Sequence, residues 1–332
     1  DQPRSRGLGD VYKRQELGQF FTPRTIVNYM VEVLNVKEGD RVCDPCCGSG
    51  GFLIQTFEHV QNLIDQDIHQ QINTLMDDVT ISESERKQRI NDLLRECDKT
   101  VNGSRYHKLC HNYFFGVDAN ARMARTSKMN MIMHGDGHVG VYLHDGLLNV
   151  GGVYDSSFDI VLINPPFGAH VEKDMRITDS DVPTEKEKEL YTKLFGSEYL
   201  ERVYNPMKEY AAKVYKDKTK GKRILELYSI KNNNTEILFM ERCINLLKPG
   251  KCAGIVLPEG VLDNTALEGV RKFIEKQARI LNITSIPADV FLSSGANIKP
   301  SLIFIQKYHE NEIPEKDYIC LLYTSPSPRD RG

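Results

Sequence analysis

The feature that most constrains the fold is a series of short apolar segments, each ending at a polar side chain and followed by a stretch of helical periodicity. The run at 158–163 ends at Asn164, for example, and the run at 41–43 ends at Asp44. The predicted strands are 41–43, 113–117, 139–143, 158–163, 251–257, 280–286 and 301–306. The predicted helices are 24–34, 52–60, 119–134, 235–247 and 266–277. Strands that alternate with helices predict an α/β domain around a mostly parallel sheet.

Two long polar stretches, 61–112 and 168–229, interrupt this alternation. The first is rich in Gln, Asp, Glu and Arg and is helix-prone, so we interpret both stretches as surface insertions. The second contains a basic cluster at 208–223, whose lysines are Lys208, Lys213, Lys216, Lys218, Lys220 and Lys222. These lysines fit either a solvated surface or direct contacts with phosphate groups.

The composition excludes several classes of protein. Hydrophobic residues make up 40% of the 332 residues, and no apolar run approaches the roughly 18 residues of a membrane helix. No secretory signal peptide is visible, so we expect a cytoplasmic protein. The eight cysteines lack the paired spacing of a disulfide scaffold or a zinc site, and we expect no metal. A net charge of −3 argues against a uniformly basic DNA-binding surface, so any nucleic-acid binding must be local or delegated.

The two ends of the chain read differently from the rest. Residues 5–15 can be encoded by one strand of a transposase-tagging adapter, and residues 320–330 can be encoded by the complementary strand. This agreement would be a rare coincidence. We therefore expect 1–15 and 320–332 to be adapter-derived and non-native, with 16–319 as the native domain.

Four polar side chains stand at or just beyond the ends of predicted strands: Asp44, Asp118, Asp145 and Asn164. Because ligands of an open α/β sheet collect beyond the carboxyl ends of its strands, one crevice could hold all four. The glycine-rich loop 44–52 lacks the spacing of a phosphate-binding or dinucleotide-binding loop. Its leading Asp44 would suit a cationic ligand such as an ammonium group, although a tight structural turn is the alternative.

Asp118 has two interpretations. At the end of the second strand it could accept hydrogen bonds from a ribose diol, with the polar stretch 61–112 explaining its distance from the glycine loop. Alternatively, Asp118 or Asn120 could cap the following helix.

The most specific signal is the Asn164, Pro165, Pro166, Phe167 sequence. Two prolines fix the backbone and remove two amide donors, which leaves carbonyl oxygens as acceptors. An exocyclic amine on a heteroaromatic ring is a poor nucleophile because its lone pair is delocalised into the ring. The Asn164 side-chain oxygen and the Pro165 carbonyl could accept hydrogen bonds from both of its N–H groups. These hydrogen bonds would localise the lone pair on the nitrogen. Phe167 could stack on a base flipped out of a duplex. The alternative is a proline-stiffened strand exit beside a core phenylalanine.

Together these segments resemble a known family. Residues 18–23, 44–52, 164–167, 234–261 and 291–295 appear in the order typical of adenine-specific DNA methyltransferases. The closest resemblance is to the modification subunit of type I restriction-modification systems, and it covers nearly all of 18–307.

The resemblance implies an S-adenosylmethionine-dependent methyltransferase fold, a Rossmann-like sheet of seven mostly parallel strands with helices on both faces. Residues 16–319 would form this catalytic domain. The S-adenosylmethionine pocket would be lined by Asp44, Gly48, Gly50 and Phe52 and closed over the methionine end by Phe21, Thr22 and Pro23. Asp118 would bind the ribose hydroxyls, and Asp145 would lie near the adenine ring of the cofactor or the target base.

The implied reaction is methylation of the N6 amino group of adenine in double-stranded DNA, with Asn164, Pro165, Pro166 and Phe167 as catalytic residues. The implied partners are double-stranded DNA, a specificity subunit, a restriction subunit and a second modification subunit. The sequence departs from the family at Cys46 and Cys47, where small residues are usual, and at Asp118, where Glu is common.

Three alternatives remain open at this point. The chain could be the catalytic core of a single-chain restriction-modification enzyme, or an assembly subunit that binds cofactor without activity of its own. The same Asn-Pro-Pro chemistry could also methylate a protein glutamine or RNA, although the element at 18–23 argues against that reading.

Overall fold

The structure, a computed structural model, describes residues 21–135, 140–287, 289–291, 299–312, 314 and 320–323. Several predicted features lie outside these residues. They are the predicted adapter residues 1–15 and 324–332, residues 18–20 of the first motif, Val139 of a predicted strand, and residues 292–295 of the last motif.

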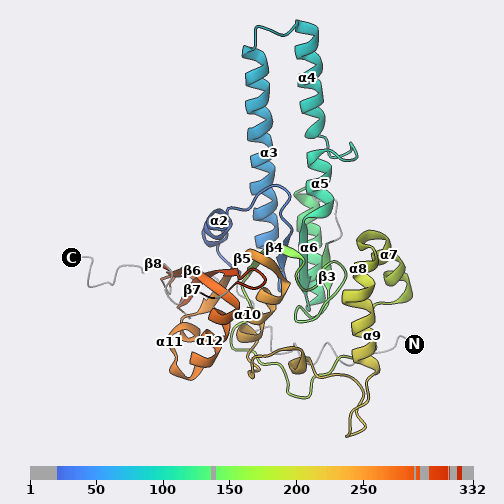
Figure 1. Ribbon diagram of the computed structural model, residues 1–332, viewed down its shortest axis with the longest axis vertical. Helices are drawn as coiled ribbons and strands as arrows, with labels where there is room; N and C mark the ends of the chain where they lie inside the picture. The colour runs from blue at the N-terminus through green and yellow to red at the C-terminus, as the bar shows by residue number, and fades with distance from the viewer. Residues whose placement is uncertain are drawn as a thin grey trace, which may run out of the picture.

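The core of the described chain is one eight-stranded sheet in the order β3-β2-β1-β4-β5-β7-β6-β8 (Figure 1). The strands are β1 (Val42–Asp44), β2 (Phe114–Asp118), β3 (Val141–Leu143), β4 (Phe158–Ile163), β5 (Leu247–Pro258), β6 (Ala278–Ser285), β7 (Pro300–Lys307) and β8 (Leu321–Tyr323). Strands β1 to β5 pair in parallel, and β7 is inserted antiparallel between β5 and β6. This confirms the predicted α/β class with a mostly parallel sheet. An eighth strand, β8, pairs in parallel with β6 and lies in the segment predicted to be adapter-derived.

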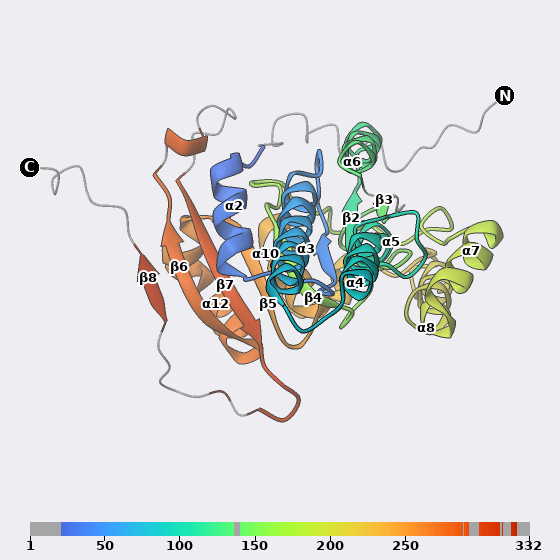
Figure 2. The same ribbon diagram turned by 90° about the horizontal axis from the view of Figure 1, so that it is seen from above.

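Helices cover both faces of the sheet (Figure 2). One face packs against α2 (Arg24–Val33), α3 (Gly51–Asp77) and α6 (Ala121–Met133), and the other packs against α10 (Thr235–Leu246) and α12 (Glu268–Gln277). The strands supply both layers because their side chains alternate. In β4, for example, Leu162 joins the first layer and Ile163 the second, and both are fully buried.

The prediction that the helix after the glycine loop ends near Val60 is wrong, because α3 continues to Asp77. Buried Ile64 and Ile68 extend its apolar stripe past Val60 at helical spacing. The rest of the polar stretch 61–112 forms α4 (Glu83–Glu96) and α5 (Arg105–Asn112), whose first turns are capped by Ser82 and Ser104. The outer half of α3 and α4 form a two-helix arm that projects from the sheet (Figure 1).

The stretch 168–229 also carries regular structure. It contains α7 (Glu185–Phe195), α8 (Ser197–Tyr199), η2 (Leu200–Tyr204), α9 (Asn205–Ala212) and η3 (Ile224–Leu227). Met207 and Ile224 are buried in the same cluster as α10, so this segment is packed onto the second face of the sheet. The basic cluster ends in a hairpin at 213–222, held by a bridge between Val214 and Lys220.

The remaining elements follow the predictions with small shifts at their ends. The predicted strand 251–257 begins earlier, at Leu247, so Pro249 and Gly250 lie inside β5, and α10 ends at Leu246. The predicted helix 266–277 is divided into η4 (Thr265–Leu267) and α12, after the short helix α11 (Gly260–Asp263). Within the described ranges, no helix is both long and apolar enough to cross a membrane.

Candidate active site

The glycine loop turns the chain from β1 into α3. Gly48 and Gly50 adopt φ angles of 52° and 89°, which favour glycine over residues with a side chain. A Cβ on Gly50 would lie 2.7 Å from the Ser127 Oγ atom of α6, so this glycine permits close packing of the loop on α6. A Cβ added to Gly48 would have no neighbouring atom of the described residues within 4 Å. The same holds for Gly51, so the loop is open at both of these glycines.

Asp118 ties the end of β2 to this loop. One of its carboxylate oxygens accepts the Gly48 amide at 2.9 Å, and the other accepts the Asn120 amide at 2.7 Å. The side-chain cap of α6 is Asn120, which accepts the amides of Arg122 and Met123. A carboxylate oxygen can accept a second hydrogen bond, so Asp118 retains capacity for a ligand hydroxyl.

Asp44 and Asp118 form an acidic edge at the ends of β1 and β2. Asp44 is 2% exposed, and its carboxylate accepts the Cys46 amide at 3.0 Å. Burial is the largest cause of a net rise in the pKa of Asp44 to about 8; the Cys46 amide opposes this rise, and the charge of Asp118 adds to it. Burial likewise raises the pKa of Asp118. A bound cation would relieve the cost of ionising both groups.

A third acidic side chain, Asp145, follows β3. It is buried, and its carboxylate accepts the Leu147 amide at 2.9 Å. Burial also raises the pKa of Asp145. The next residue, Gly146, lies directly against the glycine loop, because a Cβ there would be 1.8 Å from the Pro45 carbonyl oxygen. The loop after β3 and the loop after β1 are therefore in backbone contact.

Asn164 lies at the end of β4 and is fixed from two directions. The Cys46 thiol donates to the Asn164 carbonyl at 3.2 Å, and burial, the largest cause, raises the pKa of Cys46, which favours the protonated donor. The Asn164 side-chain NH2 donates to the Thr22 hydroxyl at 3.0 Å. Thr22 lies just before Pro23, the residue that precedes α2, and its hydroxyl is free of any role in capping that helix because it contacts the Asn164 amide.

The rest of this motif is held by α10. The Thr235 hydroxyl donates to the Pro166 carbonyl at 2.7 Å and lies 3.1 Å from the Ala169 carbonyl. Pro165 is buried, and Phe167 is half-buried against the layer that contains α2 and α3. The motif is thus a rigid strand exit.

Direct contacts involve five of the predicted site residues, namely Thr22, Asp44, Gly48, Asp118 and Asn164. Thr22, Asn164, Cys46 and Asp44 form one chain of hydrogen bonds. Gly48 of the same loop donates separately to Asp118. Two predicted pocket residues differ in their surroundings. Phe21 is 57% exposed, whereas Phe52 is 4% exposed and packs in the core.

Sequence reasoning missed the contribution of α10. Its buried Thr235, Glu241 and Arg242 hydrogen-bond to three different loops on this side of the molecule. Glu241, for example, accepts the amides of Ser229 and Ile230. The sequence signal for this role is the adjacent pair Glu241 and Arg242 in the middle of a helix whose neighbouring residues 237–240 and 243–244 are apolar.

The profile of the N-6 DNA methylase family matches residues 11–201 and 201–326. The chain belongs to this family. The methylase subunit of the type I restriction enzyme EcoEI from Escherichia coli is 22% identical over 302 residues, which cover 90% of this chain and 44% of that protein. This chain therefore spans less than half the length of that relative. The predicted resemblance to type I modification subunits is confirmed.

Solved structures agree on the fold. The M protein of the type I restriction enzyme EcoKI aligns with a TM-score of 0.56 at 20% identity, covering 94% of this chain and 50% of that one. A structure from Listeria monocytogenes described as a class I S-adenosylmethionine-dependent methyltransferase aligns with a TM-score of 0.50 at 19% identity, covering 95% of this chain and 69% of that one. The predicted fold class is confirmed, with β8 as an addition to the expected seven strands.

Proposed function

We propose that this chain is the catalytic part of a type I modification subunit, which transfers the methyl group of S-adenosylmethionine to the N6 amino group of adenine in double-stranded DNA. Membership in the N-6 DNA methylase family supports the reaction. The observation that carries the proposal is the position of Asn164, which Cys46 connects to the acidic edge of Asp44.

The residues at this edge suit S-adenosylmethionine. Its sulfonium and ammonium groups are cationic, and the buried Asp44 and Asp118 carboxylates would be stabilised in their charged form by such a ligand. The open backbone at Gly48 leaves room for a ligand to approach, and Asp118 can accept ribose hydroxyls. When bound, S-adenosylmethionine supplies an electrophilic methyl group.

In this proposal, Asn164 and Pro165 act as hydrogen-bond acceptors for the adenine amino group. Thr22 orients the Asn164 amide by accepting from its NH2 group, so the amide oxygen faces away from Thr22. Cys46 and Thr235 fix the carbonyls of Asn164 and Pro166. Such preorganised acceptors localise the lone pair of the amine without a strong base. Phe167 would contribute an aromatic face for the flipped base.

The proposed partners follow from charge and from the relatives. A net charge of −3 suits a protein whose DNA recognition is delegated to a specificity subunit. We include a restriction subunit and a second modification subunit as partners, and the cytoplasm as the location. The hairpin 213–222 is the proposed local DNA contact, since in the described structure its exposed Lys213, Lys216 and Lys218 make no ion pair.

The test is methyl transfer by the complete subunit assembled with its specificity subunit. Asn164→Ala should abolish formation of N6-methyladenine, measured by mass spectrometry of digested DNA, and leave S-adenosylmethionine affinity within a few-fold. Asn233→Ala is a matched control, because its side chain donates to the Val171 carbonyl outside the motif. An unchanged rate in Asn164→Ala would overturn the catalytic role. Cofactor binding without any transfer by the wild type would indicate an assembly subunit instead.

A further inference from the structure

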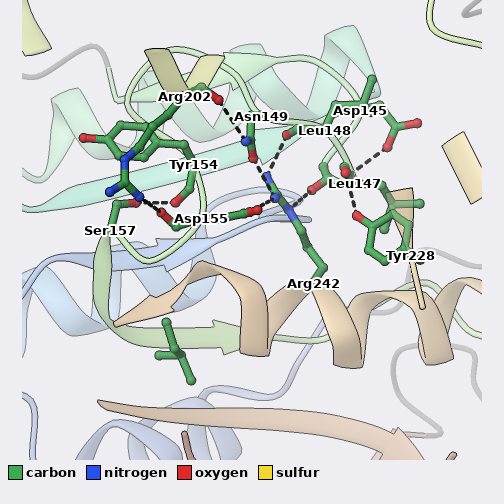
Figure 3. Close-up of polar contacts among 12 residues, drawn as sticks. Asp145, Leu147, Leu148, Asn149, Tyr154, Asp155, Ser157, Arg202, Tyr228 and Arg242 are labelled. Atoms are coloured by element: carbon green, nitrogen blue, oxygen red, sulfur yellow. Dashed lines mark hydrogen bonds and ion pairs between the residues drawn. The ribbon is translucent and has the colours of Figure 1, made fainter. Parts of the chain in front are cut away.

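Helix α10 carries an arginine in an unusual environment. Arg242 is 3% exposed, and nearly every other residue of α10 is buried too. A buried guanidinium is costly unless its donors are satisfied. Its donors are directed at the loop that follows β3, which contains Asp145 (Figure 3).

Two side chains hold three consecutive carbonyl groups of this loop. Arg242 Nε donates to the Gly146 carbonyl at 3.0 Å, and Nη2 donates to the Leu148 carbonyl at 2.8 Å. The Tyr228 hydroxyl donates to the intervening Leu147 carbonyl at 2.5 Å. Figure 3 shows both side chains reaching the loop from the side of α10. The backbone from Gly146 to Leu148 therefore has little freedom to move relative to α10.

The remaining donor of Arg242 completes the arrangement. Nη1 donates to the Asn149 side-chain oxygen at 2.7 Å and to the Asp155 carboxylate at 2.8 Å. These contacts use the planar fork of a guanidinium, whose donors point in several fixed directions. A lysine ammonium keeps the charge beside Asp155 but presents its donors from a single atom, so it cannot reach Gly146, Leu148 and Asn149 together.

The other side of the loop 145–149 faces the candidate cofactor site. Gly146 contacts the Pro45 carbonyl of the glycine loop, and the buried Asp145 directly precedes Gly146 in the chain. Thr235 holds the Pro166 carbonyl from the same helix, two turns from Arg242. Thr235 and Arg242 are about 10 Å apart along the axis of α10. This one helix thus fixes the position of the Asp145 loop relative to the Asn164 motif.

We propose that Arg242 is a positioning residue that sets the loop 145–149 against the glycine loop and thereby shapes the cofactor pocket. The proposal rests on the proposed function only for the identity of the cofactor. The contact between Arg242 and the loop can be tested without it.

The experiment compares Arg242→Lys with Ile244→Ala, a control that removes a buried side chain from the same helix without a hydrogen bond to the loop. Amide hydrogen exchange is read at Leu147 and Leu148, whose amides donate to Asp145. Affinity for S-adenosylmethionine is read by calorimetry at a fixed interval below each melting temperature. Arg242→Lys should accelerate exchange at both amides and weaken binding on the order of 10- to 100-fold. The control should change the melting temperature alone.

Tyr228→Phe is the second variant, in case Arg242→Lys does not fold. It removes one hydrogen bond to Leu147 and should weaken binding about 3- to 10-fold. Unchanged affinity in the folded variants, or equal loss in Ile244→Ala, would overturn the positioning role. If the wild type binds no S-adenosylmethionine, the proposed function fails, and the exchange rates at Leu147 and Leu148 still decide whether Arg242 holds the loop.

Discussion

Replacing Asp44 with asparagine should make the ligand-free chain more stable while it weakens cofactor binding. Asp44 is 2% exposed and its pKa is raised to about 8 by burial, with the charge of Asp118 adding to the shift. An asparagine oxygen can still accept the Cys46 amide. The substitution therefore removes the cost of protonating Asp44 on folding and keeps the hydrogen bond that shapes the loop.

The size of the effect follows from the pKa difference. An unfolded Asp ionises near 3.8, whereas folded Asp44 retains its proton up to about pH 8. The folded state thus binds more protons than the unfolded state, and stability is complete below pH 3.8 and is lost as the pH rises toward 8. At about 1.36 kcal/mol per pH unit, the cost at pH 7 is about 4 kcal/mol. Desolvation of the new NH2 group subtracts about 1–3 kcal/mol.

The assay is urea unfolding of the wild type and Asp44→Asn between pH 5 and pH 8, combined with calorimetry for S-adenosylmethionine. As the pH rises, the free energy of unfolding of Asp44→Asn should exceed that of the wild type by about a further 1.4 kcal/mol for each pH unit. Saturating cofactor should narrow the gap, since it stabilises the wild type more. A gap that does not change with pH would refute the assignment of a buried, protonated Asp44.

Asp159→Asn is a control whose effect on stability should have the opposite sign to that of Asp44→Asn. Although burial raises the pKa of Asp159, hydrogen bonds from Lys248, the Arg41 amide and Lys251 outweigh it and lower the pKa overall. Its contribution to stability is therefore present above the unfolded pKa and lost as the pH falls through the folded value. Asp159→Asn should be destabilised at pH 5 to 8 by an amount that stays constant over this range.

The remaining predictions concern Asp118 and the hairpin 213–222. Asp118→Ala should weaken S-adenosylmethionine binding by about 1–3 kcal/mol, whereas Asn120→Ala should lower stability by about 1 kcal/mol through the cap of α6. If calorimetry shows equal affinity for S-adenosylmethionine in Asp118→Ala and the wild type, Asp118 does not bind the cofactor and only anchors the glycine loop. Replacing Lys213, Lys216 and Lys218 with Gln should reduce the slope of log K for DNA against log salt by about 0.9 for each phosphate that the variant no longer neutralises. Lys272→Gln, at a lysine paired with Glu268, is the control, and an unchanged slope in the hairpin variant would identify a merely solvated surface.

The strands could be predicted because burial marks them directly in the sequence. Strand β4 occupies 158–163 as predicted, and all six of its residues are buried, so its apolar run needs no tertiary information to be recognised. The antiparallel position of β7 between β5 and β6 could not be predicted. Its apolar run is equally buried in either direction, and only the pairing of Ile305 with Ala253 and Ile280 defines its orientation.

The extension of α3 could not be recognised for the opposite reason. Beyond Ile68 the helix has no buried residue, and α4 has none along its whole length, so an apolar stripe is absent there. The arm is held partly by polar contacts. Arg86 donates to the carbonyls of Leu75 and Asp78 across the turn between the two helices. Such contacts use residue types that also occur in loops, and periodicity does not reveal them.

The candidate site divides in the same way. Asp44, Asp118 and Asn164 could be predicted because each follows an apolar strand, and the carboxyl ends of parallel strands meet at one edge. Cys46, Thr235 and Arg242 could not, because their partners lie 118, 69 and up to 96 residues away in the chain. A cysteine, a threonine and an arginine have many ordinary roles, so only the folded structure identifies these three contacts.

These two groups of residues play opposite parts in stability. The carboxylates at the strand ends are buried at a cost, as the raised pKa values of Asp44, Asp118 and Asp145 indicate, and a cationic ligand would reverse that cost. The contacts from α10 satisfy backbone carbonyls that the same loops bury. If the two effects are coupled, loosening Arg242 should allow water to reach Asp145 and lower its pKa toward the ordinary value. The burial of Asp145 therefore depends on the contacts that α10 makes with its loop.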